Sequence, residues 1–380
     1  MALKLSERGD VSPFLVMEVM RAAAEREATG KDVLHLEVGQ PGFPAPRGAR
    51  LAAAKALETE TLGYTNALGQ PDLRSKICAH YRDQYTMDID ESRIAVTTGS
   101  SAGFLLAFLA CFAPGDRVAL ADPSYPCYRN ILKAVGVEAV AIPVDASTAF
   151  QPTPEALAGL GPLDGVVVAS PGNPTGSMFA PGELGRLADW CHTAGIRLIS
   201  DEIYHGLTYG QDGETAAGSP SAIVVNSFSK YFAMTGWRIG WAILPEDLCK
   251  PIERLAQNLF ISPPAISQIA AAAAFDCHEE LQGYRDVYAA NRLDLLDALS
   301  ARGLTPAAPP DGAFYIYVDT SPVANDSPSF CTSLLNETGV AATSGLDFDP
   351  IRGSQSARFS FCASRADVQE AAKRIKAWRR

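Results

Sequence analysis

A lysine, two serines and an arginine lie close together in the chain and have the chemistry to hold a phosphorylated aldehyde. Lys230 follows Ser227 and Ser229, and Arg238 comes eight residues later. The lysine amine can form a Schiff base, while the hydroxyls and the guanidinium suit a phosphate dianion. A lysine beside serines is common on exposed loops, so these four residues alone favour a solvated loop. Other parts of the chain must supply the rest of such a site.

The elements that would position these residues follow from an alternation of short apolar runs with helical patterns. The runs are continuous, as in strands that are covered on both faces. They predict an α/β fold with a mostly parallel seven-stranded sheet in a three-layer large domain. The predicted strands span residues 94–97, 118–121, 137–142, 166–169, 196–200, 223–226 and 239–244.

A different pattern begins after residue 280 and predicts a smaller α+β domain. A charged helix is followed by a strand, a polar loop, a helix, a second strand and a terminal helix. Near the N-terminus, Ser12 as N-cap, Pro13 at the first helical position and Gly30 after the end predict another helix. We expect a large cofactor-binding domain over residues 46–280 and a small domain over residues 1–45 plus 281–380.

Charge and composition exclude several classes of partner. The net charge is −11 and no long basic run occurs, which argues against nucleic-acid and anionic membrane surfaces. The eight cysteines form no C-x-x-C pair and have no histidine at ligand spacing, so we expect reduced thiols and no metal site. No signal peptide or membrane-length apolar run is visible, which predicts a cytoplasmic protein.

Ligands of open α/β sheets bind beyond the carboxyl ends of the strands, so the residues after each predicted strand are candidates. Small residues at 99–103 open a helix and would cradle an anion. Tyr125 could stack on a heteroaromatic ring, and Asn173, in a Pro/Gly turn, is a positioned hydrogen-bond donor. Asp201 could pair with a protonated ring nitrogen that Tyr204 also reaches.

Each of these residues also has an ordinary structural interpretation. The residues would be a serine-capped helix start, a tyrosine packed in a turn, a self-bonded asparagine and, for Asp201, a helix N-cap. Four such features at four strand ends, together with Lys230 at a fifth, favour one shared site.

In this order, the motifs resemble those of the fold-type I pyridoxal-phosphate enzymes, in the class I/II aminotransferase branch that includes the aspartate and aromatic aminotransferases. The resemblance covers nearly the whole chain. It rests on residues 36–43, Tyr64, Gly69, Leu73, Arg74, residues 99–102, Tyr125, residues 173–176, Asp201, Tyr204, Lys230, Arg238, residues 312–315 and Arg358.

The resemblance implies a role for each candidate. Lys230 would form the Schiff base with pyridoxal 5'-phosphate and carry the proton, and Asp201 and Tyr204 would tune the cofactor ring. Gly39, Asn173 and Arg358 would bind the substrate, with Arg358 on its α-carboxylate. The cofactor would be held by Ser100, Ser101, Ala102, Tyr125, Asn173, Asp201, Tyr204, Ser227, Ser229, Lys230 and Arg238, and by Tyr64 from the neighbouring subunit of a homodimer.

The implied reaction is ping-pong transfer of an amino group between an L-amino acid and a 2-oxo acid. A C–S β-elimination lyase or related fold-type I lyase is an alternative, and a cofactor-sensing regulator is a remote one. An amino acid supplied without an oxo acid would distinguish them, because a transaminase stops after one turnover while a lyase continues.

We expect either a broad range of amino-acid substrates or a range limited to neutral and aromatic side chains. Ser101 stands where the aspartate-using prokaryotic branch typically has a lysine, and we identify no second arginine for a side-chain carboxylate. Phe14, Leu15 and Phe260 are candidates for an apolar pocket.

Overall fold

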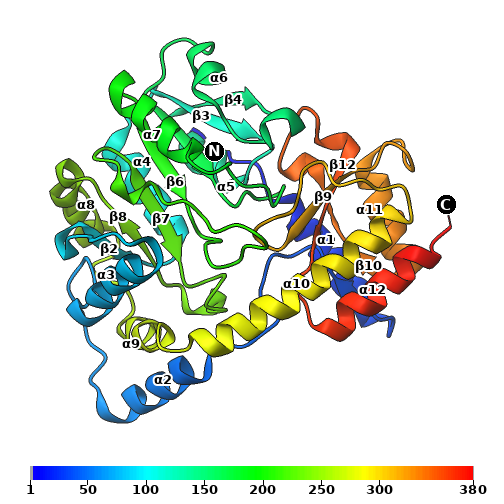
Figure 1. The fold of residues 1–380 in the computed structure, drawn as a ribbon, viewed down its shortest axis with the longest axis horizontal. Helices are drawn as coiled ribbons and strands as arrows, with labels where there is room; N and C mark the ends of the chain where they lie inside the picture. Colours follow the sequence, from blue (N-terminus) through cyan, green and yellow to red (C-terminus); the bar gives the residue numbers. More distant parts are fainter. Residues whose placement is uncertain (1–2, 380) are drawn as a thin grey trace.

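A seven-stranded sheet forms the centre of the computed structural model, which describes residues 3–379 (Figure 1). Its strand order is β2-β8-β7-β6-β5-β3-β4, and β8 runs antiparallel to both neighbours while the pairs from β7 to β4 are parallel. The fold class predicted from the sequence is confirmed. The strands are β2 (Ile94–Thr97), β3 (Arg117–Asp122), β4 (Glu138–Pro143), β5 (Gly165–Ala169), β6 (Arg197–Asp201), β7 (Ile223–Ser227) and β8 (Gly240–Ile243).

Helices cover both faces of this sheet because successive strand residues point to opposite sides. On one face of the sheet, Val167 of β5 packs with α4 and α8. On the other face, Val166 and Val168 pack in a separate core with α3 and α7. The helices of this part are α2 (Arg47–Thr59), α3 (Pro71–Tyr85), α4 (Ser100–Cys111), α5 (Cys127–Val135), α6 (Pro154–Ala158), α7 (Glu183–Ala194), α8 (Glu246–Leu259) and α9 (Ala265–Ala274).

The second part of the fold is built around a three-stranded antiparallel sheet in the order β11-β12-β9. The long helix α10 leads into it and packs along α12 (Figure 1). Near the N-terminus, β1 (Leu34–His35) pairs in parallel with β10 (Val340–Ala341), which attaches the start of the chain to this part. The other elements are α10 (His278–Ser300), β9 (Tyr315–Asp319), α11 (Ser327–Thr338), β11 (Thr343–Ser344), β12 (Ser356–Ser360) and α12 (Arg365–Ala377).

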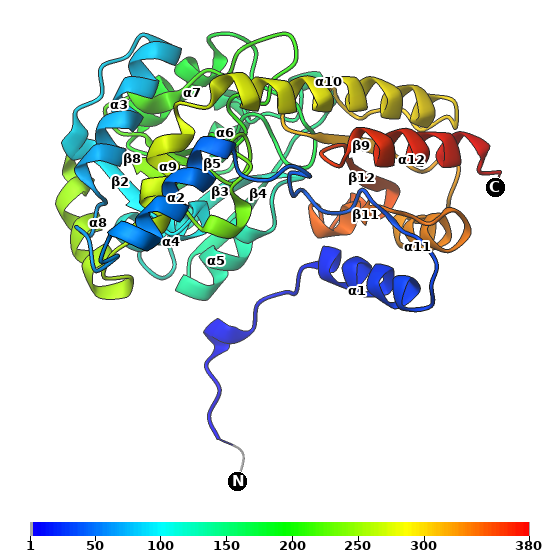
Figure 2. The ribbon, with the colours of Figure 1, turned by 90° about the horizontal axis from the view of Figure 1, so that it is seen from below.

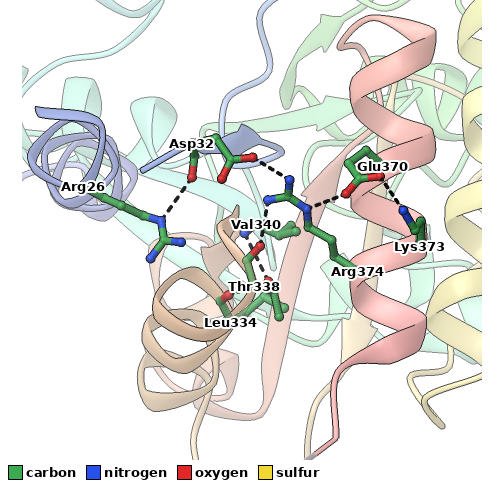
Figure 3. A network of polar contacts seen from close by, with 8 residues as sticks. All are labelled: Arg26, Asp32, Leu334, Thr338, Val340, Glu370, Lys373 and Arg374. Atoms are coloured by element: carbon green, nitrogen blue, oxygen red, sulfur yellow. Dashed lines mark hydrogen bonds and ion pairs between the residues drawn. The ribbon is translucent and has the colours of Figure 1, made fainter. Parts of the chain in front are cut away.

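A polar network around Arg374 of α12 joins three segments that are far apart in the sequence (Figure 3). The guanidinium donates to Asp32 at 2.5 Å, to Glu370 at 2.9 Å and to the carbonyl of Thr338 at 3.1 Å. Arg26 of the first helix donates to the backbone carbonyl of Asp32 at 3.1 Å. Exposed ion pairs add little to the stability of a fold. The network therefore chiefly fixes the path of the chain between the first helix and β1.

The first long helix, α1 (Leu15–Ala28), begins later than the sequence predicts. Ser12 and Pro13 lie outside it, and Phe14 at the N-cap position supplies no side-chain hydrogen bond. The Asp347 carboxylate instead accepts from the N–H groups of Leu15 at 3.0 Å and Val16 at 3.4 Å. The helix and its end are confirmed, but the predicted start was wrong because the cap comes from a residue 332 positions away.

None of the helices described is both long and apolar enough to span a membrane.

Candidate active site

A cleft of about 360 Å³ opens at the carboxyl ends of the central strands, large enough for a small ligand. Most of the predicted site residues line it: Gly39, Ser100, Ser101, Tyr125, Asn173, Asp201, Tyr204, Ser229, Lys230, Arg238 and Arg358. Ala102, Ser227 and Tyr64 are not among the lining residues. Ala102 is buried in α4, Ser227 bonds to Ser229 and to the carbonyl of Ile239, and Tyr64 is 85% exposed elsewhere on the surface.

Lys230 lies just after β7 and projects its amine into the cleft. Nζ donates to the carbonyl oxygen of Gly39 at 2.7 Å. Burial lowers the pKa of this amine to about 8. A larger share of the amine is therefore neutral near physiological pH than in an exposed lysine, as a nucleophile or proton acceptor requires.

Asp201 ends β6 and is almost fully buried beside the cleft. Its Oδ1 accepts from the N–H of Ile203 at 3.0 Å, and its Oδ2 accepts from the hydroxyl of Tyr128. Burial raises the pKa of this carboxyl to about 6. The carboxylate has no cation in hydrogen-bonding contact among the residues described, and a cationic ring nitrogen is the kind of partner it lacks.

An anion cradle forms where α4 begins and Arg238 returns to it. Gly99 precedes the helix with φ of +81°, and a Cβ there would lie 2.3 Å from Nη2 of Arg238. Arg238 itself has a left-handed φ of +50°, a rare conformation for a residue with a side chain. No side chain caps α4, so its first N–H groups, with Ser100, Ser101 and Arg238, suit a phosphate.

Arg358 of β12 lines the same cleft, and its guanidinium lies over two aromatic rings. Its guanidinium carbon is 4.3 Å from the ring centre of Tyr315 and 4.6 Å from that of Phe348. Nη1 donates to Oδ1 of Asn173 at 2.9 Å, and Nη2 donates to the carbonyl of Glu37 at 2.5 Å. Nε is buried with no hydrogen-bond partner among the described residues, which leaves a donor for an absent anion.

An apolar wall completes the cleft on the side of α1. It consists of Phe14, Val16, Met17 and Met20, and the Phe14 ring stacks on Tyr125 with centroids 6.1 Å apart. Phe14 therefore lies where the sequence suggested an apolar pocket. The other two candidates do not: Leu15 lines a separate groove against α11, and Phe260 packs on the core formed by α4 and α8.

Sequence reasoning missed three features of the site. Tyr128 lies in the first turn of α5, just after Tyr125, and the two rings meet edge to face with centroids 5.5 Å apart. Tyr315 belongs to a motif that the sequence singles out, but its contact with Arg358 comes from pairing of β9 with β12, and its hydrogen bond to Tyr204 joins β9 to the segment after β6. Phe348 lies in an irregular loop, and no local pattern indicates it.

The residues present fit pyridoxal phosphate. The cradle at Gly99 matches a phosphate, and the buried Asp201 matches a protonated ring nitrogen. The desolvated Lys230 amine matches an aldehyde, and the unpartnered Nε of Arg358 matches a carboxylate of an amino acid. No group of three or more His, Cys, Asp or Glu side chains suited to a metal ion occurs within residues 3–379.

Comparisons with known proteins agree with this arrangement. The family model described as aminotransferase class I and II matches residues 31–375. A valine–pyruvate aminotransferase of Mycobacterium tuberculosis is 50% identical, with 99% of this chain and 98% of that protein covered.

Solved structures resemble the whole chain. An aminotransferase from Mycobacterium tuberculosis superposes with a TM-score of 0.96 at 49% identity, covering 99% of both chains. Aspartate aminotransferase from Thermus thermophilus with maleate gives 0.92 at 30% identity, covering 99% of this chain and all of the other.

Proposed function

The chain belongs to the class I and II aminotransferase family and is an aminotransferase, and from this premise we propose that it takes the amino group of a neutral aliphatic L-amino acid and gives it to a 2-oxo acid. The observation that carries the proposal is the apolar wall of Phe14, Val16, Met17 and Met20, which lines the same cleft as Arg358. The relative named for valine and pyruvate makes these two the first substrates to test.

The charges in the cleft support a neutral substrate side chain. Among the described residues that line it, the lysines and arginines are Lys230, Arg238 and Arg358. We assign Arg238 to the phosphate and Arg358 to the α-carboxylate of the substrate. No further cation of this chain remains there for a side-chain carboxylate, which disfavours aspartate as the preferred donor.

Members of this family depend on pyridoxal phosphate, and we propose that it binds in this cleft. When bound, it supplies an aldehyde that condenses with amines and a ring that accepts the electron pair released at the substrate Cα. Its phosphate would be held at the start of α4 and at Arg238, its ring nitrogen by Asp201, and one ring face by Tyr125. The complete proposed set is Ser100, Ser101, Ala102, Tyr125, Asn173, Asp201, Tyr204, Ser227, Ser229, Lys230 and Arg238, with Tyr64 of the partner subunit.

Lys230 is the proposed catalytic base. Because its pKa is lowered to about 8, Nζ can be neutral and take the proton from the substrate Cα. It would then deliver this proton to the carbon that was the aldehyde carbon of the cofactor. The carbonyl of Gly39, which accepts from Nζ in the structure, keeps the amine in the cleft. Tyr128 and the N–H of Ile203 stabilise the ionised form of Asp201 against the cost of its burial.

Arg358 is the proposed grip on the α-carboxylate, helped by Asn173 and by the backbone of Gly39. The rings of Tyr315 and Phe348 on its two sides exclude water and fix the plane of the guanidinium. A fixed planar fork recognises a carboxylate through two parallel hydrogen bonds, which orients the Cα–H bond toward Lys230.

We also propose a homodimer in the cytoplasm. Tyr64 is 85% exposed although it belongs to the motifs shared with the family, which supports a role in a partner's site. All eight cysteines are unpaired, which supports a reducing compartment.

The test is to incubate the purified protein with valine and pyruvate and to measure 3-methyl-2-oxobutanoate and alanine. Equal amounts of the two products are expected, with none from Lys230→Ala, which should also lose the visible absorbance of the bound aldehyde. The same assay with aspartate and oxo acid is the comparison. A kcat/KM for aspartate far above that for valine would refute the aliphatic substrate, and a colourless protein that takes up no pyridoxal phosphate would refute the cofactor.

A further inference from the structure

Helix α1 depends on a distant residue for its first turn. Its own N-cap residue, Phe14, offers no side-chain hydrogen bond. Both carboxylate oxygens of Asp347 accept from the first backbone N–H groups, Oδ1 from Leu15 and Oδ2 from Val16. A carboxylate at this position also interacts favourably with the positive end of the helix dipole. Asp347 is only 4% exposed, so water is a poor substitute for it.

The two faces of α1 have different surroundings. Val16, Met17 and Met20, at helical spacing, line the substrate cleft. Leu15 and Val19 line a separate groove against α11. Figure 2 shows that α1 lies beside the small sheet and α11 while the chain before it leads away from the molecule. The segment before α1 contacts α5, where the Ser12 carbonyl accepts from Asn130 at 3.2 Å and the Asp10 carboxylate pairs with Lys133 at 3.7 Å, but it supplies no side-chain cap to the first turn.

The loop that carries Asp347 is itself fixed to the large sheet. Arg129 of α5 donates to the carbonyls of Asp347 and Phe348, the latter at 3.1 Å. The N–H of Ser124, which follows β3, donates to the Phe348 carbonyl at 3.1 Å. Phe348, the next residue after Asp347, packs on the guanidinium of Arg358. One short loop thus connects Arg358, the proposed binding group for the α-carboxylate, to the apolar wall.

The far end of α1 has its own attachment. Arg26 donates to the carbonyl of Asn336 at 3.0 Å and to that of Asp32 at 3.1 Å. These contacts are remote from the cleft and hold the last turn of the helix. The first turn, which carries Val16 and Met17, receives its capping hydrogen bonds from Asp347.

We propose that Asp347 is a positioning residue that sets the distance between the apolar wall of α1 and Arg358, and thereby the size of side chain that the enzyme accepts. The inference rests on the proposed function in assigning the α-carboxylate to Arg358. Asp347 also lines the cleft, and both of its oxygens accept from backbone N–H groups of α1.

The experiment uses full-length holoenzyme and follows the half-reaction with a single amino acid, so that no oxo acid is needed. Wild type, Asp347→Ala, Asp347→Asn and Ser364→Ala are compared with valine and with alanine. Ser364 is the matched control because it caps α12, away from the cleft, through the N–H of Asp367. Half-saturating concentration and limiting rate are measured for each pair.

We expect Asp347→Ala to raise the half-saturating concentration of valine about tenfold and that of alanine less than about twofold, with limiting rates nearly kept. Alanine is too short to use the wall, so its binding reports Arg358 alone. Asp347→Asn should lie closer to wild type than Asp347→Ala, because its amide oxygen can still accept from the N–H of Leu15 although its NH2 group cannot accept from Val16. Ser364→Ala should change neither amino acid.

Equal weakening of valine and alanine in Asp347→Ala, or no change in either, would overturn the proposal. If wild type does not use valine, the proposed substrate fails, and the ratio is then measured between its best donor and alanine. Amide hydrogen exchange gives a second readout: the first turn of α1 should exchange faster in Asp347→Ala while α12 does not. If that variant does not fold, Asp347→Ser, with its shorter acceptor, replaces it in both measurements.

Discussion

At the residue scale, the contacts of Arg358 fix the orientation of its guanidinium for binding a carboxylate. Its side chain is 5% exposed, stacked between two rings and bonded to Asn173 and to the carbonyl of Glu37. These contacts hold the guanidinium plane but leave Nε free. A lysine could supply the charge but not the fork.

We therefore expect Arg358→Lys to raise the half-saturating amino-acid concentration about 100-fold, equivalent to roughly 3 kcal/mol. Cofactor uptake should stay unchanged, since Arg238 and the start of α4 hold the phosphate. Titration of the half-reaction with valine and a separate cofactor-binding measurement check the two parts. A variant that loses cofactor as well would contradict the assignment of Arg358 to the substrate.

Asp201 gives a prediction about pH. Its pKa is raised from 3.8 to about 6 by burial, so the folded state binds this proton more tightly than the unfolded state. The stability of the folded state therefore falls as pH rises from about 4 to about 6, and the loss persists above that. In apoprotein, Asp201→Asn should be more stable than wild type by about 3 kcal/mol above about pH 6, and the difference should vanish below about pH 4.

Denaturant unfolding of both apoproteins across this pH range measures the effect. The same variant should bind pyridoxal phosphate more weakly, because the amide cannot neutralise a protonated ring nitrogen. A stability difference that is constant with pH would show that the amide acts through packing rather than charge.

The site was predictable from the sequence where the residues follow strands. Lys230, Asp201 and Asn173 each come directly after an apolar run, and parallel strands bring such ends together. Phe348 and Met17 could not be found this way. Phe348 reaches the cleft from the loop after β11, and Met17 reaches it from α1, whose cap, Asp347, is distant in the sequence. No pattern in the neighbouring sequence indicates either contact.

At the element scale, Gly99 leaves room for the Arg238 guanidinium at the start of α4. Any residue with a Cβ at this position would displace that guanidinium. We expect Gly99→Ala to weaken pyridoxal phosphate binding at least about tenfold, since its methyl group would collide with the guanidinium and displace a charge-assisted contact. Gly182→Ala is the matched control: its φ of +84° is similar, but nothing lies within 4 Å of an added Cβ.

The control should lose about 1–2 kcal/mol of stability from its left-handed backbone and bind the cofactor normally. Fluorescence titration with the cofactor separates the two variants. Equal loss of affinity in both would mean that strain, not the contact with Arg238, determines the result.

Element boundaries were predictable where apolar runs contrast with their flanks. All seven strands of the large sheet were anticipated to within a residue or two of their observed bounds. Helices α2 and α9 were not anticipated. In α9 nearly every residue is apolar and buried, so no polar face marks a helical period, and in α2 the buried face is a narrow stripe of alanines.

At the scale of the whole molecule, the proposed homodimer predicts that each site is completed by the other chain. Tyr64→Phe should bind cofactor more weakly, and Lys230→Ala should be inactive. In mixed dimers of the two variants, the site that keeps Lys230 receives Tyr64 from its partner and regains wild-type affinity. Mixing and re-equilibrating the two proteins, then measuring activity at limiting cofactor, tests this, and no recovery on mixing would contradict the shared site.

The division into domains at residues 45 and 280 stays a prediction. Several contacts support it: β1 pairs with β10, Arg374 joins Asp32 to α12, and α10 begins beside α9 and continues to the small sheet. Limited proteolysis that cuts first near residue 45 or 280 is the expected outcome.

The placement of catalytic residues at strand ends has a consequence for how such a chain changes over time. Lys230 and Asp201 belong to the large sheet, whereas the wall of α1 and the loop that carries Asp347 lie near the two ends of the chain. A new side chain at position 16, 17 or 20 alters which amino acid is accepted without moving either catalytic group. Relatives can thus differ in amino-acid specificity while they keep the same reaction. Mutant libraries that seek new amino-group donors should vary residues 14–20 and 345–348.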